Sequence, residues 1–302
     1  MGKKRRKTGG YTLALIALGF IAGALIAVLG LKYMGFERTP PERPRVSVPP
    51  PARVEPERGP APYEAPPPII EDEPAPGKAI TPPKLPRLAV VIDDMGPDIN
   101  KLRELLALDK PVTIAVMPKM RFSKEVSREA ASGGLDVIVH MPMEPKNTEG
   151  HNPGNGALLV AMTDEEIAHL LDEGFKSVPG AIGLNNHMGS RFTEDPEKMS
   201  IVLKDVRERG LLFLDSRTSS ETVGGSLARK LKVRSAERNV FLDNTRDVDY
   251  IKGQLMEAAR IARKSGKAVA IGHPYPETIR ALKEAIPGLE GVEIVGLSEI
   301  AE

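Results

Sequence analysis

The residues best suited to acid–base or metal chemistry follow short apolar runs in the second part of the sequence. They stand at the ends of six predicted strands: Asp93–Asp94, His140, Asn185–His187, Asp215–Arg217, Asp243 and His273. In a barrel of parallel strands all these ends lie on one rim, where active sites are built. Six polar strand ends that hold three of the five histidines are difficult to explain by packing alone. The pattern therefore predicts a functional site at this rim.

Two imidazoles and a nearby carboxylate have the composition of a catalytic metal site with three protein ligands. His140, His187 and one of the two adjacent aspartates supply that composition. Neighbouring side chains on a strand point in opposite directions, but the chain turns at a strand end, so Asp93 and Asp94 can both reach one pocket. We expect one aspartate to bind the metal and the other to act as a base.

Simpler interpretations exist for the same residues. Asp93 or Asp94 can be the N-cap of the next helix, and His140 and His187 can be buried histidines held by hydrogen bonds. Asp215 and Arg217 can form an ordinary ion pair. Asp243 precedes Asn244 and Thr245, and we interpret it as a turn residue. These alternatives remain open from sequence alone.

Composition narrows the class of protein. The 302 residues include 42 Lys and Arg against 41 Asp and Glu, a net charge of +1. Because nucleic-acid-binding proteins normally carry a basic excess, no nucleic-acid partner is expected. The chain has no cysteine, which excludes disulfides, thiolate metal sites and cysteine nucleophiles.

Residues 1–36 are predicted to form a short basic cytoplasmic tail and a membrane anchor. A basic cluster, Lys3–Lys7, precedes an uncharged and mostly apolar stretch from Thr8 to Leu31. About 20 helical residues cross a bilayer core, and the basic end stays in the cytoplasm. We expect a single-pass protein of the bacterial inner membrane with its folded part on the periplasmic side. A cleavable signal peptide is the alternative, although its apolar region is usually shorter.

Residues 37–86 read as a disordered linker. They hold 17 of the 28 prolines, and proline fixes φ and removes backbone donors, so neither helix nor sheet continues through them. The expected role is a semi-rigid tether, with docking of a protein partner on a PxxP motif as an alternative.

Residues 87–302 read as one α/β domain. Predicted strands alternate with helical patterns, at Leu88–Ile92, Val112–Val116, Asp136–Val139, Ala181–Leu184, Leu211–Leu214, Asn239–Leu242, Ala268–Ile271 and Val292–Val295. Thr163 and Glu166 form a capping box, Asp195-Pro196 starts a second helix, and Val248–Lys264 forms a third that Gly266 ends. Such alternation implies a parallel sheet, open or closed into a barrel. No GxGxxG follows the first strand, so a dinucleotide-binding fold has no support.

The strand-end motifs resemble those of the divergent polysaccharide deacetylases, distant relatives of the NodB-type carbohydrate esterases. Val91–Gly96 resembles their first motif, which ends in two aspartates, and Ile271–His273 resembles their last, leucine-x-histidine. Asn185–Ser190 resembles a signature of the divergent branch. The second motif, H-[ST]-x-x-H-P, departs from the pattern, because Met141 replaces Ser/Thr and Glu144 replaces the second histidine.

The resemblance implies a distorted (β/α) barrel of seven or eight parallel strands and assigns roles to residues. Asp93 would be the catalytic base. Asp94 and His140 would be metal ligands, and His187 would supply the imidazole that the second motif lacks. The metal would be divalent, most simply zinc. His273 would be the general acid. Asp215 or Arg217 would orient a partner.

Two further residues are possible additions to this site. Glu144 would be a neighbour of the ligands or a fourth ligand, and Asn186 belongs to the same signature as His187.

The expected function is that of a metal-dependent hydrolase that removes acetyl groups from a cell-envelope carbohydrate. Only seven aromatic residues lie in 87–302 and the chain has no Trp, which favours a short glycan or another small acetylated substrate over a long stacked chain. Two alternatives stay open. One is a non-catalytic envelope domain that binds a glycan or a protein through a degenerate deacetylase site, and the other is a different metal hydrolase, such as an amidase or phosphoesterase.

Overall fold

The computed structural model describes residues 85–302. The predicted anchor in residues 1–36 and nearly all of the predicted linker in 37–86 lie outside this range. Within the described range, no helix combines the length and the apolar character needed to span a membrane. The first strand begins at Arg87.

A parallel sheet forms the centre of the domain. Its strands are β1 (Arg87–Met95), β2 (Thr113–Val116), β3 (Val137–Met143), β4 (Gly183–Met188), β5 (Leu212–Asp215), β6 (Ser235–Glu237), β7 (Val240–Phe241), β8 (Lys267–Gly272) and β9 (Glu293–Val295). The order is β6-β5-β4-β3-β2-β1-β8-β7, and β9 pairs with the first residues of β1. Every pairing is parallel. The predicted distorted (β/α) barrel is confirmed as a half-barrel that is open between β6 and β7.

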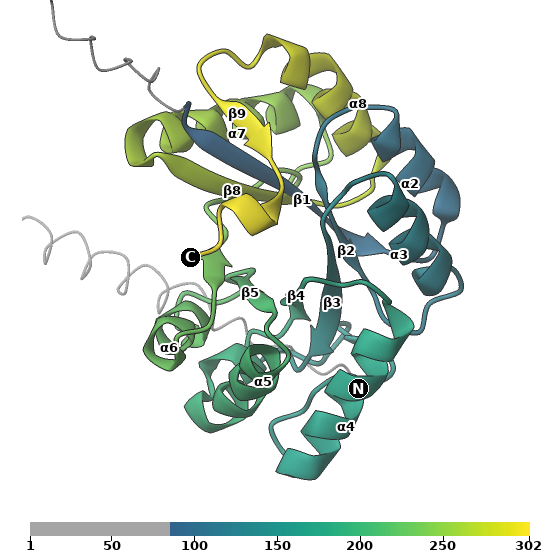
Figure 1. Ribbon diagram of the computed structural model, residues 1–302, viewed down its shortest axis with the longest axis vertical. Helices are drawn as coiled ribbons and strands as arrows, with labels where there is room; N and C mark the ends of the chain where they lie inside the picture. The colour runs from purple at the N-terminus through teal and green to yellow at the C-terminus, as the bar shows by residue number, and fades with distance from the viewer. Residues whose placement is uncertain (1–84) are drawn as a thin grey trace, which may run out of the picture. The chain divides into compact units, whose positions relative to one another are not determined.

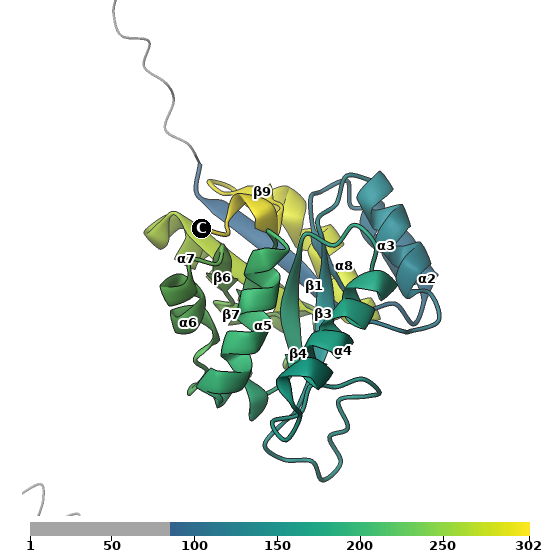
Figure 2. The same cartoon turned by 60° about the horizontal axis from the view of Figure 1, so that its bottom comes forward.

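In the described residues 85–302, seven α-helices surround the sheet (Figure 1). They are α2 (Ile99–Leu106), α3 (Ser123–Ser132), α4 (Asp164–Ser177), α5 (Pro196–Glu208), α6 (Gly224–Leu231), α7 (Val248–Ser265) and α8 (Pro276–Ala285). Figure 2 shows α4 and α5 side by side, with their axes along the neighbouring strands. The described residues also contain three short 3-10 helices. They come after β4, α8 and β9, at Phe192–Glu194, Ile286–Gly288 and Leu297–Glu299.

The predicted helix ends are confirmed. Thr163 and Glu166 form a reciprocal capping box at α4, which satisfies two backbone N–H groups that the first turn leaves unpaired. Asp195 accepts hydrogen bonds from two backbone N–H groups at the start of α5. Gly266 ends α7 with φ of +84°, a left-handed conformation that glycine adopts without the steric cost of a Cβ.

Alternation along each strand separates two apolar clusters. The larger one, with Leu88, Val90 and Ile92, lies between the sheet and the helices. The smaller one lines the concave interior and includes Ala89 and Val91. Because strand side chains alternate with a period of two, every residue two positions beyond an interior residue also faces the interior.

Each of the eight predicted strands coincides with an observed one, and three of them continue at least three residues past the predicted end. β1 continues to Met95. β3 continues to Met143 and β4 to Met188, and the two strands pair residue by residue, with His140 opposite Asn185. The polar residues of β1, β3 and β4 therefore lie within these strands, whereas Asp243 and His273 follow β7 and β8. β6 was not predicted, because its three residues Ser235–Glu237 carry no apolar run.

Candidate functional site

A cleft of about 440 Å³ opens at the carboxyl ends of the strands. It is lined by Asp93, Asp94, His140, Asn186, His187, Met188, Ser216, Thr218, Phe241, Asp243, Asn244, Arg246, His273 and Tyr275. The rim predicted from the strand ends is thus a real concavity. It brings together residues that are up to 182 positions apart in the chain, from Asp93 to Tyr275.

The period of the strands explains why the acidic and imidazole groups meet. Each follows an interior apolar residue by two positions: Asp93 after Val91, His140 after Ile138, and His273 after Ile271. The strand face that carries the interior apolar cluster therefore carries the polar side chains of the cleft two residues further along each strand.

Asp94 breaks the alternation and still enters the cleft. The pairing of β1 with β2 shifts register between Ile92 and Met95, and Asp94 has a left-handed backbone with φ of +56°. A β-bulge of this kind re-aims a side chain, so adjacent carboxylates reach the same space. The helix that follows is capped by Asp98, so neither Asp93 nor Asp94 is its N-cap.

Asp94, His140 and His187 form a compact triangle of ligand-type atoms. Asp94 Oδ1 lies 3.2 Å from His140 Nε2 and 3.0 Å from His187 Nδ1. The two ring nitrogens are 3.1 Å apart. Ligands around a tetrahedral Zn²⁺ at ordinary bond lengths are separated by about 3.3 Å, so the three atoms have the mutual spacing that one small cation requires.

Asn185 determines which nitrogen of His140 faces this triangle. Its amide N–H donates to the Asp93 carboxylate at 2.9 Å and to Ser216 Oγ at 3.1 Å. Because a carboxylate only accepts, the amide oxygen of Asn185 must face His140 Nδ1, which lies 2.8 Å away. Nδ1 therefore carries a proton, and Nε2 is the nitrogen that faces Asp94 and His187. This matches the usual support of a metal-binding histidine.

The Oδ1 atom of Asp94 is buried and, among residues 85–302, has no hydrogen-bond partner. Burial raises the pKa of Asp94, but the rings of His140 and His187 outweigh this effect and lower it well below its ordinary value. Burial lowers the pKa of His140, and the charges of Asp93 and Asp94 reverse this and raise it to about 9. A buried anionic oxygen between two imidazoles fits a divalent cation.

Asp93 lies beside the triangle with a different environment. Its side chain is almost fully buried, and its Oδ1 is 3.6 Å from His140 Nδ1. Burial raises the pKa of Asp93, and this outweighs the opposing charges of His140 and His273 and the hydrogen bond from Asn185. A carboxylate with a raised pKa is a stronger base than an ordinary aspartate.

On the opposite side of the cleft, His273 is held by Asp243. The His273 ring Nδ1 lies 2.9 Å from Asp243 Oδ1, while Asp243 Oδ2 accepts from the His273 backbone N–H and from Thr278 Oγ1. Burial lowers the pKa of His273, but the hydrogen bond and charge of Asp243 raise it above its ordinary value. His273 Nε2 lies 4.0 Å from Asp94 Oδ2. The interpretation of Asp243 as a turn residue is wrong.

The cleft also has an aromatic and cationic side. Tyr275 stacks on the His273 ring, with centroids 5.4 Å apart. The Arg246 guanidinium lies 3.5 Å from the centroid of the Tyr275 ring. Phe241 also lines the cleft. Sequence reasoning missed all three residues, because no pattern singled them out from other aromatic or basic positions.

Three predicted residues, Asp215, Arg217 and Glu144, are not part of the cleft lining. Asp215 is fully buried beneath α6 and accepts from the backbone N–H of Arg217 and Gly225 and from Thr222 Oγ1. Arg217 pairs with Glu237 at 2.9 Å, so no Asp215–Arg217 side-chain pair forms.

Glu144 and Asn186 connect neighbouring loops. Glu144 pairs with Arg191 at 2.7 Å and accepts from the backbone N–H of Val160, away from the triangle. Asn186 lines the cleft and holds the loop after β5, because its Oδ1 accepts from the backbone N–H of Ser216. The two remaining histidines, at 151 and 169, are exposed.

Two proteins of other bacteria are similar to this chain in sequence. The chain is 35% identical over 215 residues to an uncharacterised protein of Haemophilus influenzae, covering 71% of this chain and 76% of that protein. It is 33% identical over 203 residues to the uncharacterised protein YibQ of Escherichia coli, covering 67% of this chain and 63% of YibQ.

A solved structure and a family model extend the comparison. A crystal structure of an uncharacterised protein from Agrobacterium tumefaciens C58 superposes with a TM-score of 0.68 at 26% identity, over 72% of this chain and 89% of that one. The family model described as divergent polysaccharide deacetylase matches residues 90–301, which span every cleft residue named above. The chain belongs to the divergent polysaccharide deacetylase family.

Proposed function

We propose that this protein is a divalent-metal-dependent hydrolase that removes an acetyl group from a cell-envelope carbohydrate. The observation that carries the proposal is the triangle of Asp94, His140 and His187, with a buried base on one side and a supported imidazole on the other. Zinc is the metal that we propose, because two imidazoles and one carboxylate with an open position are typical of catalytic zinc sites.

The division of labour follows from the two sides of the cleft. A bound cation would supply Lewis-acid polarisation of the acetyl carbonyl and a lowered pKa for water. Asp93, with its raised pKa, accepts the proton of the attacking water. Asp243 raises the pKa of His273, which favours the protonated ring, and His273 donates this proton to the departing amine or alkoxide.

The size and lining of the cleft favour a short stretch of glycan. The volume of about 440 Å³ lies at the lower end for small-molecule sites. Phe241 and Tyr275 are in the lining of the cleft and supply aromatic surface that a sugar ring can contact. The proposed periplasmic location, which rests on the N-terminal sequence, would bring this cleft to envelope glycans.

The test is acetate release by the full chain, purified in detergent and loaded with one equivalent of zinc. N-acetylated oligosaccharides of two to four sugars, an acetylated peptide and a phosphate ester are compared. Zinc-dependent acetate release from the oligosaccharides is expected. Stoichiometric zinc without any acetate release would contradict the proposal and favour a binding domain, whereas turnover of the phosphate ester alone would assign another hydrolase class.

Zinc affinity is expected to fall as pH decreases. The pKa of His140 is about 9 without metal, so below that pH zinc must displace the proton of the ligand nitrogen. One displaced proton weakens the apparent affinity about tenfold per pH unit. Competition with a chromophoric chelator over a series of pH values measures this slope. An affinity that does not change with pH would show that His140 is not a ligand.

Replacing Asn185 by leucine is expected to weaken zinc binding without removing any ligand. The leucine is similar in size but cannot accept from His140 Nδ1, so the ring loses its fixed tautomer. Loss of such a supporting partner typically costs 10–100-fold in metal affinity. The same chelator competition measures it, and Asn100→Leu, at an exposed position of α2 outside both cavities, is the control. Equal affinities in both variants would contradict the assigned tautomer.

A further inference from the structure

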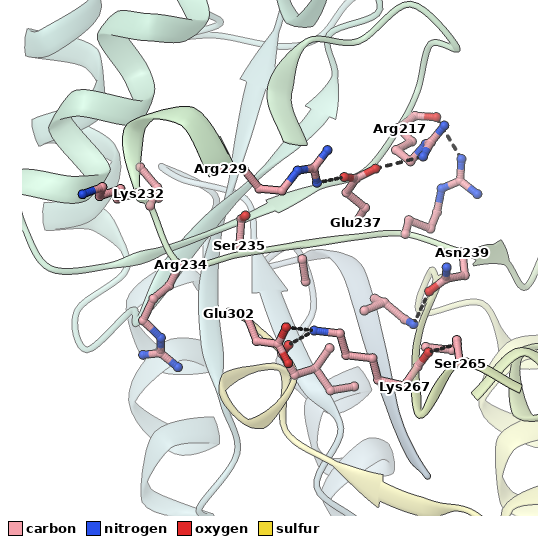
Figure 3. A pocket seen from close by; sticks show the side chains of 16 residues that line it. Arg217, Arg229, Lys232, Arg234, Ser235, Glu237, Asn239, Ser265, Lys267 and Glu302 are labelled. Atoms are coloured by element: carbon pink, nitrogen blue, oxygen red, sulfur yellow. Dashed lines mark hydrogen bonds and ion pairs between the residues drawn. The ribbon is translucent and has the colours of Figure 1, made fainter. Parts of the chain in front are cut away.

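A second cavity lies where the half-barrel fails to close. β6 pairs with β5 and β7 pairs with β8, although only two residues separate β6 from β7 in the sequence. Asn239 bridges part of the gap, because its backbone N–H donates to Val269 and its side-chain oxygen accepts from Val269, both at 2.8 Å. At the start of β6, Ser235 exchanges two backbone hydrogen bonds with Glu302. Between these bridges remains a cavity of about 730 Å³, the seam cavity (Figure 3).

Its walls are strongly basic. Six cationic side chains line the seam cavity: Arg217, Arg229, Lys232, Arg234, Arg238 and Lys267. The lining contains only two acidic side chains, Glu237 and Glu302. The domain around them is acidic overall, since residues 87–302 contain 29 basic and 33 acidic residues. The concentration of positive charge is therefore a local feature and not a consequence of composition.

The two carboxylates compensate only part of this charge. Glu237 lies between Arg229 and Arg217, and Lys267 is directed at Glu302 at 2.8 Å (Figure 3). Among residues 85–302, Lys232, Arg234 and Arg238 form no salt bridge within 4.0 Å. Lys232 and Arg234 thus have no carboxylate within ion-pair distance, and Arg238 is attracted only by the more distant charges of Asp215 and Asp93.

The bonds that these arginines do form hold them in place without neutralising them. Arg234 donates to the backbone oxygen of Ser298 at 2.9 Å. Arg238 donates to the backbone oxygens of Ser216 and Arg217 at 2.6 and 2.8 Å. Burial lowers the pKa of Arg238 and the positive charge of Arg217 lowers it further, although Asp215 opposes this. Two guanidinium groups that lie side by side, one of them fixed and partly buried, repel each other, and a bound anion would offset this repulsion by charge-assisted hydrogen bonds.

We propose that the seam cavity binds an anionic ligand that carries at least two carboxylate or phosphate groups. Arginine forks match both groups in a bidentate manner, and the volume of about 730 Å³ lies within the usual range of ligand sites. The seam cavity is separate from the catalytic cleft. The two have no lining residue in common. They adjoin at the loop after β5, where Arg217 lines the seam cavity and Ser216 and Thr218 line the cleft. They also adjoin where the Arg238 guanidinium of the seam cavity lies 3.8 Å from the ring centroid of Phe241 in the cleft. The proposal therefore does not depend on deacetylase activity.

The test is calorimetric titration of the full chain in detergent, freed of metal on a chelating resin, at low ionic strength. Inorganic pyrophosphate and tricarballylate are the two probes, which separate phosphate from carboxylate recognition. Saturable binding of at least one probe with a stoichiometry of one is expected, and it should weaken as salt is added. Failure of both probes to bind would overturn the proposal.

Variants locate the binding. Arg234→Gln and Lys232→Gln remove uncompensated cations at the seam, and each should weaken binding of the probe about tenfold. Arg128→Gln, an exposed residue of α3 outside both cavities, should bind as the wild type does. Arg246→Gln tests the catalytic cleft with the same change of charge. Wild-type binding in Arg234→Gln and Lys232→Gln, or loss only in Arg246→Gln, would overturn the assignment to the seam cavity.

Discussion

Replacing His140 by alanine is expected to remove zinc binding and acetate release together. His140 Nε2 is one corner of the triangle, and the two remaining corners, Asp94 and His187, supply only two ligands. Disturbing a neighbour of a ligand already costs 10–100-fold in metal affinity, so loss of a ligand should cost at least about 100-fold. Metal content by mass spectrometry and chelator competition measure the effect.

A matched control separates this loss from a general effect of removing an imidazole. His169→Ala makes the same change on α4, where the side chain is 70% exposed and its nearest carboxylate is 3.6 Å away on the same helix. This variant should keep zinc and activity. If His140→Ala retained stoichiometric zinc at wild-type affinity, the three residues would not share an ion, and the proposed hydrolase would lose its main support.

Much of the fold was predictable because its signals are local. Apolar runs located eight strands, and caps such as Thr163 and Asp195 located helix starts. Three parallel-strand ends carrying Asp94, His140 and His187 indicated a shared rim, since such ends lie on one side of a parallel sheet. The family resemblance pointed to the same three residues, and their convergence depends only on strand direction.

Finer assignments needed the register of each strand. Asp215 follows Leu214, an interior residue, by one position and therefore faces outward to α6, whereas Ser216 faces inward. The same period places Asn185 beside His187 on the inner face of β4. This signal was present in the sequence, but the predicted β4 ended at Leu184, before both residues, so the period was not followed into them.

Other features had no local signal. The bulge that turns Asp94 into the cleft depends on the register between β1 and β2, which is a property of two strands together. The seam cavity depends on β6 and β7 choosing different neighbours. Glu144 lies at the position of a ligand in the related motif, yet it pairs with Arg191, a residue that is distant in sequence.

Replacing Asp93 by asparagine is expected to slow acetate release while zinc stays bound. Asparagine has nearly the same shape, and Asp93 is not a corner of the triangle, so the ligands keep their places. The variant cannot accept a proton at this position, and loss of general base assistance typically costs 10²–10⁴ in rate. The rate constant kcat, measured by acetate release at saturating substrate, should fall within that range.

Folding of the variant provides the control. Burial raises the pKa of Asp93 in the folded protein, which means that its ionised form destabilises the fold at neutral pH. A neutral amide removes this cost, so the Tm of the variant should equal or exceed that of the wild type. A lower Tm accompanied by loss of zinc would show that Asp93 supports the ligands. An unchanged kcat would show that the proton goes elsewhere, and His273 would then be the one remaining imidazole outside the triangle that can accept it.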